Sequence, residues 1–161
     1  MASNFERMIQ LADEVFSAHN DPQQLDVDEQ VMERLEKLHP ATLSEHIEGD
    51  GPVVWILLIP TTKELMFRFI AEEISEKELL NLTPLNAQYD ALYLCSALVL
   101  PEWRKKGLAT QTGLNAIAQI RKDHPIQYLF TWNFSIEGAN LANAAAAYEK
   151  LQLFKRRVKS K

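Results

Sequence analysis

Residues 91–109 have the sequence A-L-Y-L-C-S-A-L-V-L-P-E-W-R-K-K-G-L-A. The first ten are almost all apolar and are followed by Pro101, which predicts that they form a buried strand. A basic turn comes next, at 104–107, and the apolar spacing of residues 109–121 predicts a helix. A turn of this kind directs backbone N–H groups and the positive end of the helix dipole at one spot. We therefore expect an anion site, in which Gly107 lets a phosphate approach the backbone closely.

Two further apolar runs, at residues 53–59 and 126–134, also predict strands. The first shows no polar alternation, so we expect it to be buried on both faces of a sheet. Residues 41–52 have no clear pattern. Capping boxes and apolar residues at helical spacing predict helices elsewhere. These are expected at 3–19, opened by Ser3 and Glu6; from about 26 to 39; at 61–70, opened by Thr61 and Glu64; at 75–82, opened by Ser75 and Glu78; and at 141–151.

The order of these elements predicts the fold class. Strands that alternate with helices indicate an α/β (α+β) domain layered around a central sheet. No internal repeat or glycine–serine linker divides the chain, so we expect residues 1–161 to form a single domain. With 161 residues, 47% of them hydrophobic and 24% charged, the chain has the size and composition of a soluble domain with a sizeable core.

The cysteine content and the apolar runs exclude several classes of protein. The single cysteine, Cys95, rules out an internal disulfide and a cysteine-based zinc cluster, and its place in an apolar run predicts a buried thiol. The longest apolar run, 53–59, is too short to cross a bilayer, and no signal peptide precedes Phe5. We therefore expect a cytoplasmic protein without a membrane partner.

The glycines and histidines exclude further kinds of site. The five glycines fit neither a dinucleotide-binding fingerprint nor a P-loop. The histidines lack metal-ligand spacing, and no metal site is expected. We expect them on the surface or at helix ends: His19, His39, His46 and His124.

The net charge of -5 is divided unevenly along the chain. Residues 1–100 contain 6 basic and 18 acidic residues, a net charge of -12, whereas residues 101–161 contain 11 and 4, a net charge of +7. This asymmetry indicates that the two halves face different partners. The last seven residues carry +5, and we expect a solvated tail, with contacts to ligand phosphates or nucleic acid as alternatives. Nucleic acid is not expected as the main partner, because the rest of the chain is strongly acidic and repels phosphates.

Residues 98–109, L-V-L-P-E-W-R-K-K-G-L-A, resemble the signature of the GNAT superfamily of acetyl-CoA-dependent N-acyltransferases. That signature is a strand ending in valine, then a proline, an aromatic residue and Arg/Gln-x-x-Gly-x-Gly/Ala. A second match is Y-E-K-L at 148–151, where the family often has Y-E-K-L-G-F. The resemblance covers about residues 91–154. It implies a GNAT-like mixed central sheet flanked by helices, with a helical N-terminal part and a shortened C-terminus.

The resemblance also implies a reaction, in which an amine attacks the thioester carbonyl of acetyl-CoA directly within a ternary complex. Leu98 and Val99 would offer backbone groups to the pantetheine arm of CoA and would polarise that carbonyl. The pyrophosphate would be bound by Arg104, Lys105, Lys106, Gly107, Leu108, Ala109 and Thr110.

Three residues of the last predicted helix have implied roles. Tyr148 would protonate the departing thiolate as a general acid. Its spacing from Leu141 and Leu151 equally fits a tyrosine in the hydrophobic core. Asn140 and Asn143 flank the position at which the family has an asparagine, and either would contact CoA.

The sequence departs from the family pattern at both ends. Only eight residues follow Leu153, too few for the usual closing hairpin, and the helical stretch 61–82 occupies the place of a hairpin before the signature. We therefore expect an acceptor groove that is nonstandard or is completed by a second copy in a homodimer. No general base is evident: Glu137, Glu102 and Asp90 are candidates, but each also fits a surface carboxylate.

These observations leave three functions open. The first is an N-acetyltransferase that uses acetyl-CoA on an amine of a small molecule or peptide. The second is a catalytically degenerate GNAT-fold module that binds CoA or another protein, which the lack of an evident base favours. The third is a scaffold domain in which 104–107 is only a charged turn.

Overall fold

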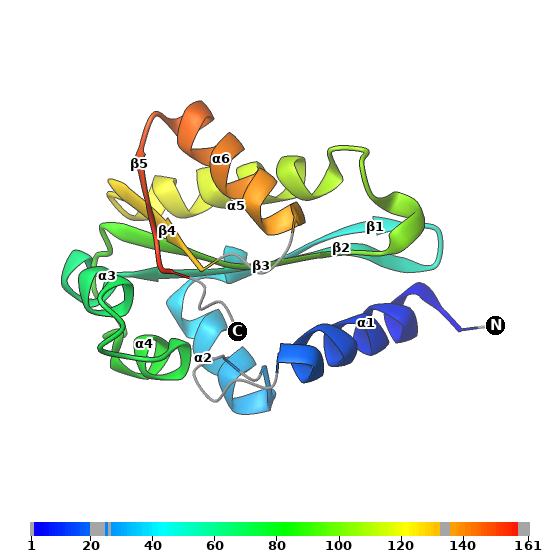
Figure 1. Cartoon of the computed structure of the whole chain (residues 1–161), viewed down its shortest axis with the longest axis horizontal. Coiled ribbons are helices and arrows are strands. Elements are labelled where there is room, and N and C mark those ends of the chain that lie inside the picture. Colours follow the sequence, from blue (N-terminus) through cyan, green and yellow to red (C-terminus); the bar gives the residue numbers. More distant parts are fainter. Residues whose placement is uncertain (1, 20–24, 26, 133–135, 158–161) are drawn as a thin grey trace.

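The computed structural model describes residues 2–19, 25, 27–132 and 136–157, and Figure 1 shows how their helices and strands are arranged. Within these residues, five strands form one sheet in the order β1-β2-β3-β4-β5. They are β1 (Leu43–Glu48), β2 (Gly51–Thr61), β3 (Ala91–Val99), β4 (Tyr128–Thr131) and β5 (Gln152–Lys155). The first three strands are antiparallel, while β4 runs parallel to β3 and β5 parallel to β4. A mixed sheet with flanking helices confirms the expected mixed α/β class.

The described part of the chain contains six α-helices, which cover both faces of the sheet. α5 (Leu108–Asp123) and α6 (Ile136–Glu149) lie over one face. α1 (Asn4–His19), α2 (Glu29–Leu38) and α4 (Glu76–Leu82) lie on the other, and α3 (Lys63–Ile70) follows the end of β2 (Figure 1). α3 and α4 lie between β2 and β3 along the chain, where the sequence predicts helices.

Side-chain caps determine where two of these helices begin. Ser75 and Glu78 form the predicted capping box at the start of α4, with both N–H···O distances 3.1 Å. α3 is capped by Thr62, whose hydroxyl accepts the Leu65 N–H at 3.3 Å. The expectation that Thr61 caps this helix is therefore wrong by one residue, because Thr61 is still the last residue of β2.

The strands differ from the prediction at the edges of the sheet. β2 is buried on both faces as expected, with only Trp55 partly exposed between residues 53 and 59. β1 and β5 were not expected, because their sequences, L-S-E-H-I-E and Q-L-F-K, carry little apolar pattern. Both are edge strands, which need less apolar surface than central ones. β4 is shorter than the apolar run that predicted it, and residues 133–134 of that run lie outside the described residues.

β3 extends beyond its pairing with β4, which leaves part of one edge of β3 without a strand partner among the described residues. The pairing of β2 with β3 shifts between Leu57–Ser96 and Leu58–Leu94, so Cys95 is an extra residue in a β-bulge. β3 pairs with β4 only as far as Leu94. Beyond that point, within the described residues, no strand pairs with β3 on the β4 side. We call this region the wedge; it borders residues 95–99.

The two helices above the sheet approach each other closely at Gly113 of α5. A side-chain carbon at this position would overlap the Leu141 side chain of α6. Leu141 is 2% exposed, so it has little room to move away. The absence of a side chain at Gly113 therefore lets α6 pack directly on α5, which brings the start of α6 beside the start of α5.

Candidate functional site

The turn between β3 and α5 has the backbone that an anion site needs. After a 3-10 turn at Pro101–Trp103, Lys105 and Gly107 adopt positive φ angles of 63° and 77°. Gly107 is the N-cap of α5 and supplies no side chain to cap the helix. The first N–H groups of α5 are therefore left for water or a ligand. Space beside Gly107 is open, since a Cβ built there would meet no heavy atom within 4 Å.

An open pocket of about 80 Å³ lies at this turn, room for several water molecules. It brings together most of the residues that the sequence resemblance assigns to CoA: Val99, Arg104, Lys105, Gly107, Leu108, Ala109, Thr110 and Asn140. Trp103 and Glu137 also line it, and neither was predicted to bind a ligand. We call it the anion pocket.

Three of the expected ligand residues are not among those that line the pocket. Lys106 is exposed on the turn itself, and Asn143 is exposed on α6, one helical turn beyond Asn140. Leu98 is 8% exposed and belongs to the core. Of Leu98, only the backbone groups are candidates for ligand binding.

The direction of the β3 backbone N–H and C=O groups decides which residues can form hydrogen bonds in the wedge. The Leu100 N–H donates to the Val53 carbonyl at 3.0 Å, which turns the backbone groups of Leu100 toward β2. Because these directions alternate along an antiparallel strand, Leu98 also faces β2, while Ala97 and Val99 face the wedge. The backbone of Leu98 is therefore turned away from the wedge, whereas the backbone groups of Ala97 and Val99 face it.

Arg104 connects the wedge with the anion pocket. Its Nε donates to the Val99 carbonyl oxygen at 3.0 Å, so this carbonyl on the open edge is bound by a side chain instead of a strand. The same Nε lies 3.4 Å from Oε1 of Glu137, near the start of α6. Among the ion pairs of the described residues, none involves Lys105 or Lys106. Arg104 and Lys105 thus line the pocket and Lys106 lies on the same turn, and of these three cations only Arg104 is paired with a carboxylate.

The structure places Tyr148 away from the pocket. Tyr148 is 72% exposed, so the interpretation of it as a core tyrosine is wrong. It lies eleven residues after Glu137 on the same helix, roughly 16 Å along the axis. The geometry therefore gives no support to the expected role of Tyr148 as a general acid.

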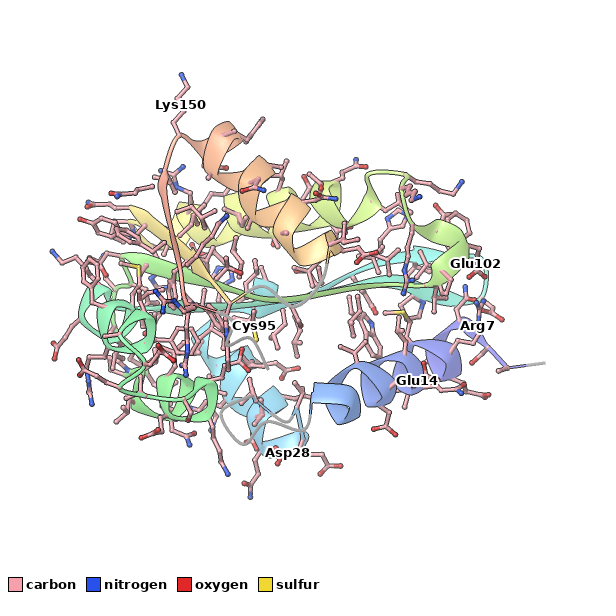
Figure 2. All side chains as sticks on the ribbon, viewed as in Figure 1. Arg7, Glu14, Asp28, Cys95, Glu102 and Lys150 are labelled. Atoms are coloured by element: carbon pink, nitrogen blue, oxygen red, sulfur yellow. The ribbon has the colours of Figure 1, made fainter. Side chains whose placement is uncertain are left out.

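A buried hydrogen-bonded cluster lies at the bulge, on the face of β3 opposite α5 and α6. Figure 2 shows Cys95 on this face. Glu76, which is 6% exposed, accepts the Leu25 N–H at 2.7 Å through Oε1. Its Oε2 accepts the Tyr93 hydroxyl at 2.5 Å and the Cys95 thiol at 3.5 Å. Burial raises the pKa of Glu76, and the hydrogen bonds partly offset this rise.

The three carboxylates considered as general bases are each engaged elsewhere. Glu102 forms a two-point ion pair with Arg7, which lowers the pKa of Glu102 to about 2. Asp90 accepts the Lys63 N–H at 2.7 Å, at the start of α3. Glu137 contacts Arg104 in the anion pocket. None of the three is placed beside the wedge as a free proton acceptor.

The basic C-terminal segment is not wholly a solvated tail. Lys155 belongs to β5, and Arg156 is only 5% exposed. Arg156 Nη1 donates to the Ile74 carbonyl at 2.8 Å, and its guanidinium lies 4.6 Å and 4.3 Å from the ring centres of Phe69 and Trp132. These contacts stabilise the buried charge, so the expectation of a solvated segment is wrong for Arg156. Residues 158–161 lie outside the described residues.

Two of the histidines lie at helix ends, as expected, whereas His46 lies in strand β1 and is partly exposed. His39 and His124 are the C-cap residues of α2 and α5, as predicted. His39 Nδ1 accepts the Ala41 N–H at 3.0 Å, and its Nε2 lies 2.6 Å from Asp123 Oδ2. Throughout the described ranges, no three or more histidine, cysteine, aspartate or glutamate side chains are grouped so as to hold a metal ion.

Comparisons of the chain with protein-family models, curated proteins and solved structures find no match. Each helix in the part of the chain that the structure describes is too short or too polar to cross a membrane. The functional argument therefore rests on the geometry of the anion pocket and the wedge.

Proposed function

We propose that this chain is a GNAT-type N-acetyltransferase that transfers the acetyl group of acetyl-CoA to an amine by direct attack. The observation that carries the proposal is that the wedge and the anion pocket are consecutive along residues 97–110. CoA has the same two parts in sequence: a diphosphate, and an extended amide-containing arm that ends in the thiol. The mixed sheet with helices on both faces is also the arrangement that the sequence resemblance implies.

The anion pocket suits the diphosphate. The uncapped N–H groups at the start of α5 point toward it, and the helix dipole favours negative charge there. Arg104 and Lys105 line the pocket, and Lys106 is exposed on the same turn. Hydrogen bonds from such cations to phosphate oxygens are charge-assisted and stronger than neutral ones.

The wedge suits the pantetheine arm. An extended chain of amides can pair with an unpaired strand edge as an added strand does. The backbone groups of Val99 and Ala97 face the wedge and are placed to make such bonds. The thioester at the end of the arm then lies near the bulge, where the Ala97 N–H can donate to its carbonyl oxygen.

In the proposed reaction, the amine nitrogen bonds to the thioester carbonyl carbon and the carbon–sulfur bond then breaks. The Ala97 N–H stabilises the negative charge that develops on the carbonyl oxygen. The ammonium formed by the attack loses a proton and the thiolate gains one. We assign neither proton transfer to Tyr148, because its side chain is exposed to solvent.

Calorimetric titration with CoA and acetyl-CoA tests the binding step, and we expect micromolar affinity. Replacing both Lys105 and Lys106 with alanine should weaken binding by roughly tenfold or more, because charges that face the diphosphate are lost. The matched control replaces Lys122 and Lys150, which lie outside the anion pocket, and should change the affinity by less than about twofold. Absence of binding at millimolar CoA contradicts the proposal.

The second candidate is a module that binds CoA without turnover. The carboxylates favour it, since Glu102, Asp90 and Glu76 are all engaged in ion pairs or hydrogen bonds. A panel of amines with acetyl-CoA and detection of released thiol separates the two functions. An enzyme releases thiol faster than the reaction without protein for at least one amine, whereas a binding module does so for none.

A further inference from the structure

Arg104 occupies a position that two parts of a bound CoA would both need. Its Nε binds the Val99 carbonyl oxygen, which is the acceptor on the open edge nearest the anion pocket. Its guanidinium also lines that pocket, where a phosphate would bind. In the structure described here, Glu137 lies across the pocket and contacts the same Nε atom.

We propose that Arg104 is a positioning residue with two alternative positions, and that Glu137 sets the balance between them. In the ligand-free position, Arg104 covers the Val99 carbonyl and pairs with Glu137. When a diphosphate enters the pocket, Arg104 turns to its oxygens and leaves the Val99 carbonyl free to accept an amide N–H of the pantetheine arm. This inference rests on the proposed function and adds a coupling between the two ends of the site.

The energetics and the exposure of the side chains favour such a change. A guanidinium forms stronger hydrogen bonds with phosphate than with a neutral carbonyl, because both partners carry charge. The Arg104 side chain is 40% exposed and can therefore change rotamer without repacking the core. Glu137 lines the same pocket and contacts Arg104, so its carboxylate competes with the phosphate for Arg104.

This arrangement predicts which ligands the site favours. A ligand that has only an amide arm has to displace Arg104 from Val99, and a ligand that has only a phosphate has to displace it from Glu137. A ligand that carries both groups at the right spacing has to move Arg104 only once, and both groups then bind. Phosphate binding and arm binding should therefore strengthen each other by the same factor.

Glu137→Gln tests the role of Glu137, with inorganic pyrophosphate as the probe in calorimetry. We expect pyrophosphate to bind about fivefold tighter or more, because the competing charge is removed. The matched control is Glu149→Gln, which removes the same charge from the same helix at a residue that pairs with Arg121. The control should bind pyrophosphate as the wild type does. Unchanged or weaker binding by Glu137→Gln overturns the proposal.

Arg104→Ala tests the coupling, with pantetheine as the second probe. In the wild type, saturating pyrophosphate should strengthen pantetheine binding by about fivefold. In Arg104→Ala, pantetheine alone should bind more tightly than it binds the wild type, and pyrophosphate should no longer affect it. Equal pantetheine binding by the wild type with and without pyrophosphate overturns the inference while leaving the proposed function intact. If CoA and pyrophosphate both fail to bind at millimolar concentration, the proposed function falls and this inference with it.

Discussion

Arg7 of α1 forms a two-point ion pair with Glu102, just before the basic turn (Figure 2). The two N···O distances are 2.6 Å and 2.7 Å. This pair joins the N-terminal helix to the strand–turn–helix segment that forms the anion pocket, beside the end of β3. Glu102 lies two residues before Arg104. Because Glu102 is paired with Arg7, a phosphate at the turn would not meet it as a free carboxylate.

The first prediction concerns the pH dependence of this pair. The pKa of Glu102 is lowered to about 2, mainly by its hydrogen bond with Arg7. The folded state therefore releases this proton more readily than the unfolded state, and the stabilisation is present above the unfolded pKa of about 4.3. It is lost as the pH falls toward 2. In Arg7→Ala, carboxyl titration by NMR should show the pKa of Glu102 returning to the ordinary range.

The matched control for that titration is Arg68→Ala, which breaks a longer ion pair of 3.8 Å with Glu73. It should leave the titration of Glu102 unchanged. A low Glu102 pKa that persists in Arg7→Ala would show that another group holds the charge.

The second prediction concerns the buried cluster at the bulge. Burial raises the pKa of Glu76, so the folded state holds this proton more tightly than the unfolded state. Stability is therefore lost as the pH rises from about 4.3 through the folded pKa. Glu76→Gln keeps hydrogen-bonding groups of similar shape and should remove this dependence, as measured by urea unfolding at pH 5 and pH 8.

Glu76→Ala is the destructive counterpart. It leaves the Leu25 N–H and the Tyr93 hydroxyl without their acceptor, which should cost about 2–4 kcal/mol at both pH values. If Glu76→Gln is destabilised as much as Glu76→Ala, the charge on Glu76 is required and the expectation for the glutamine variant is wrong.

The third prediction concerns the contact between α5 and α6. Gly113→Ala should destabilise the protein by about 1–3 kcal/mol, because the new methyl group overlaps Leu141. The expected gain in helix propensity, about 1 kcal/mol, opposes this cost only in part. In a double-mutant cycle with Leu141→Ala, the cost of Gly113→Ala should largely disappear. A cost that does not depend on the residue at 141 would place the strain elsewhere.

The fourth prediction concerns Tyr148. Because the side chain is exposed to solvent, Tyr148→Phe should change kcat by less than about twofold in the thiol-release assay. The affinity for CoA should also stay the same. A fall in kcat of tenfold or more would return Tyr148 to the mechanism as a general acid.

Elements with a strong apolar pattern could be predicted from the sequence. The three inner strands and the helix after Gly107 follow from long apolar runs and clear turn residues. The edge strands β1 and β5 could not be predicted, because hydrogen bonding to a neighbouring strand stabilises them more than their own apolar content does.

The candidate site also has residues that could be predicted from the sequence and residues that could not. The basic turn is local, so the sequence shows it directly. Glu137 and Asn140 reach the pocket only because α6 packs on α5, a contact made possible by Gly113, which is far from them in sequence. The direction of the β3 backbone groups depends on the pairing with β2, so the choice of Ala97 over Leu98 required the structure.

The bulge at Cys95 determines which substitutions, insertions and deletions β3 tolerates. Leu94 presents its carbonyl toward β4, where the Thr131 hydroxyl donates to it at 3.0 Å, whereas Ala97 and Val99 present theirs to the same edge farther along. Even-numbered residues therefore use this edge before Cys95, and odd-numbered residues use it afterwards. A substitution at Cys95 that preserves the bulge keeps that change of parity, but an insertion or deletion between residues 95 and 99 exchanges the roles of Leu98 and Val99. The length of this segment is thus constrained more tightly than the identity of its residues.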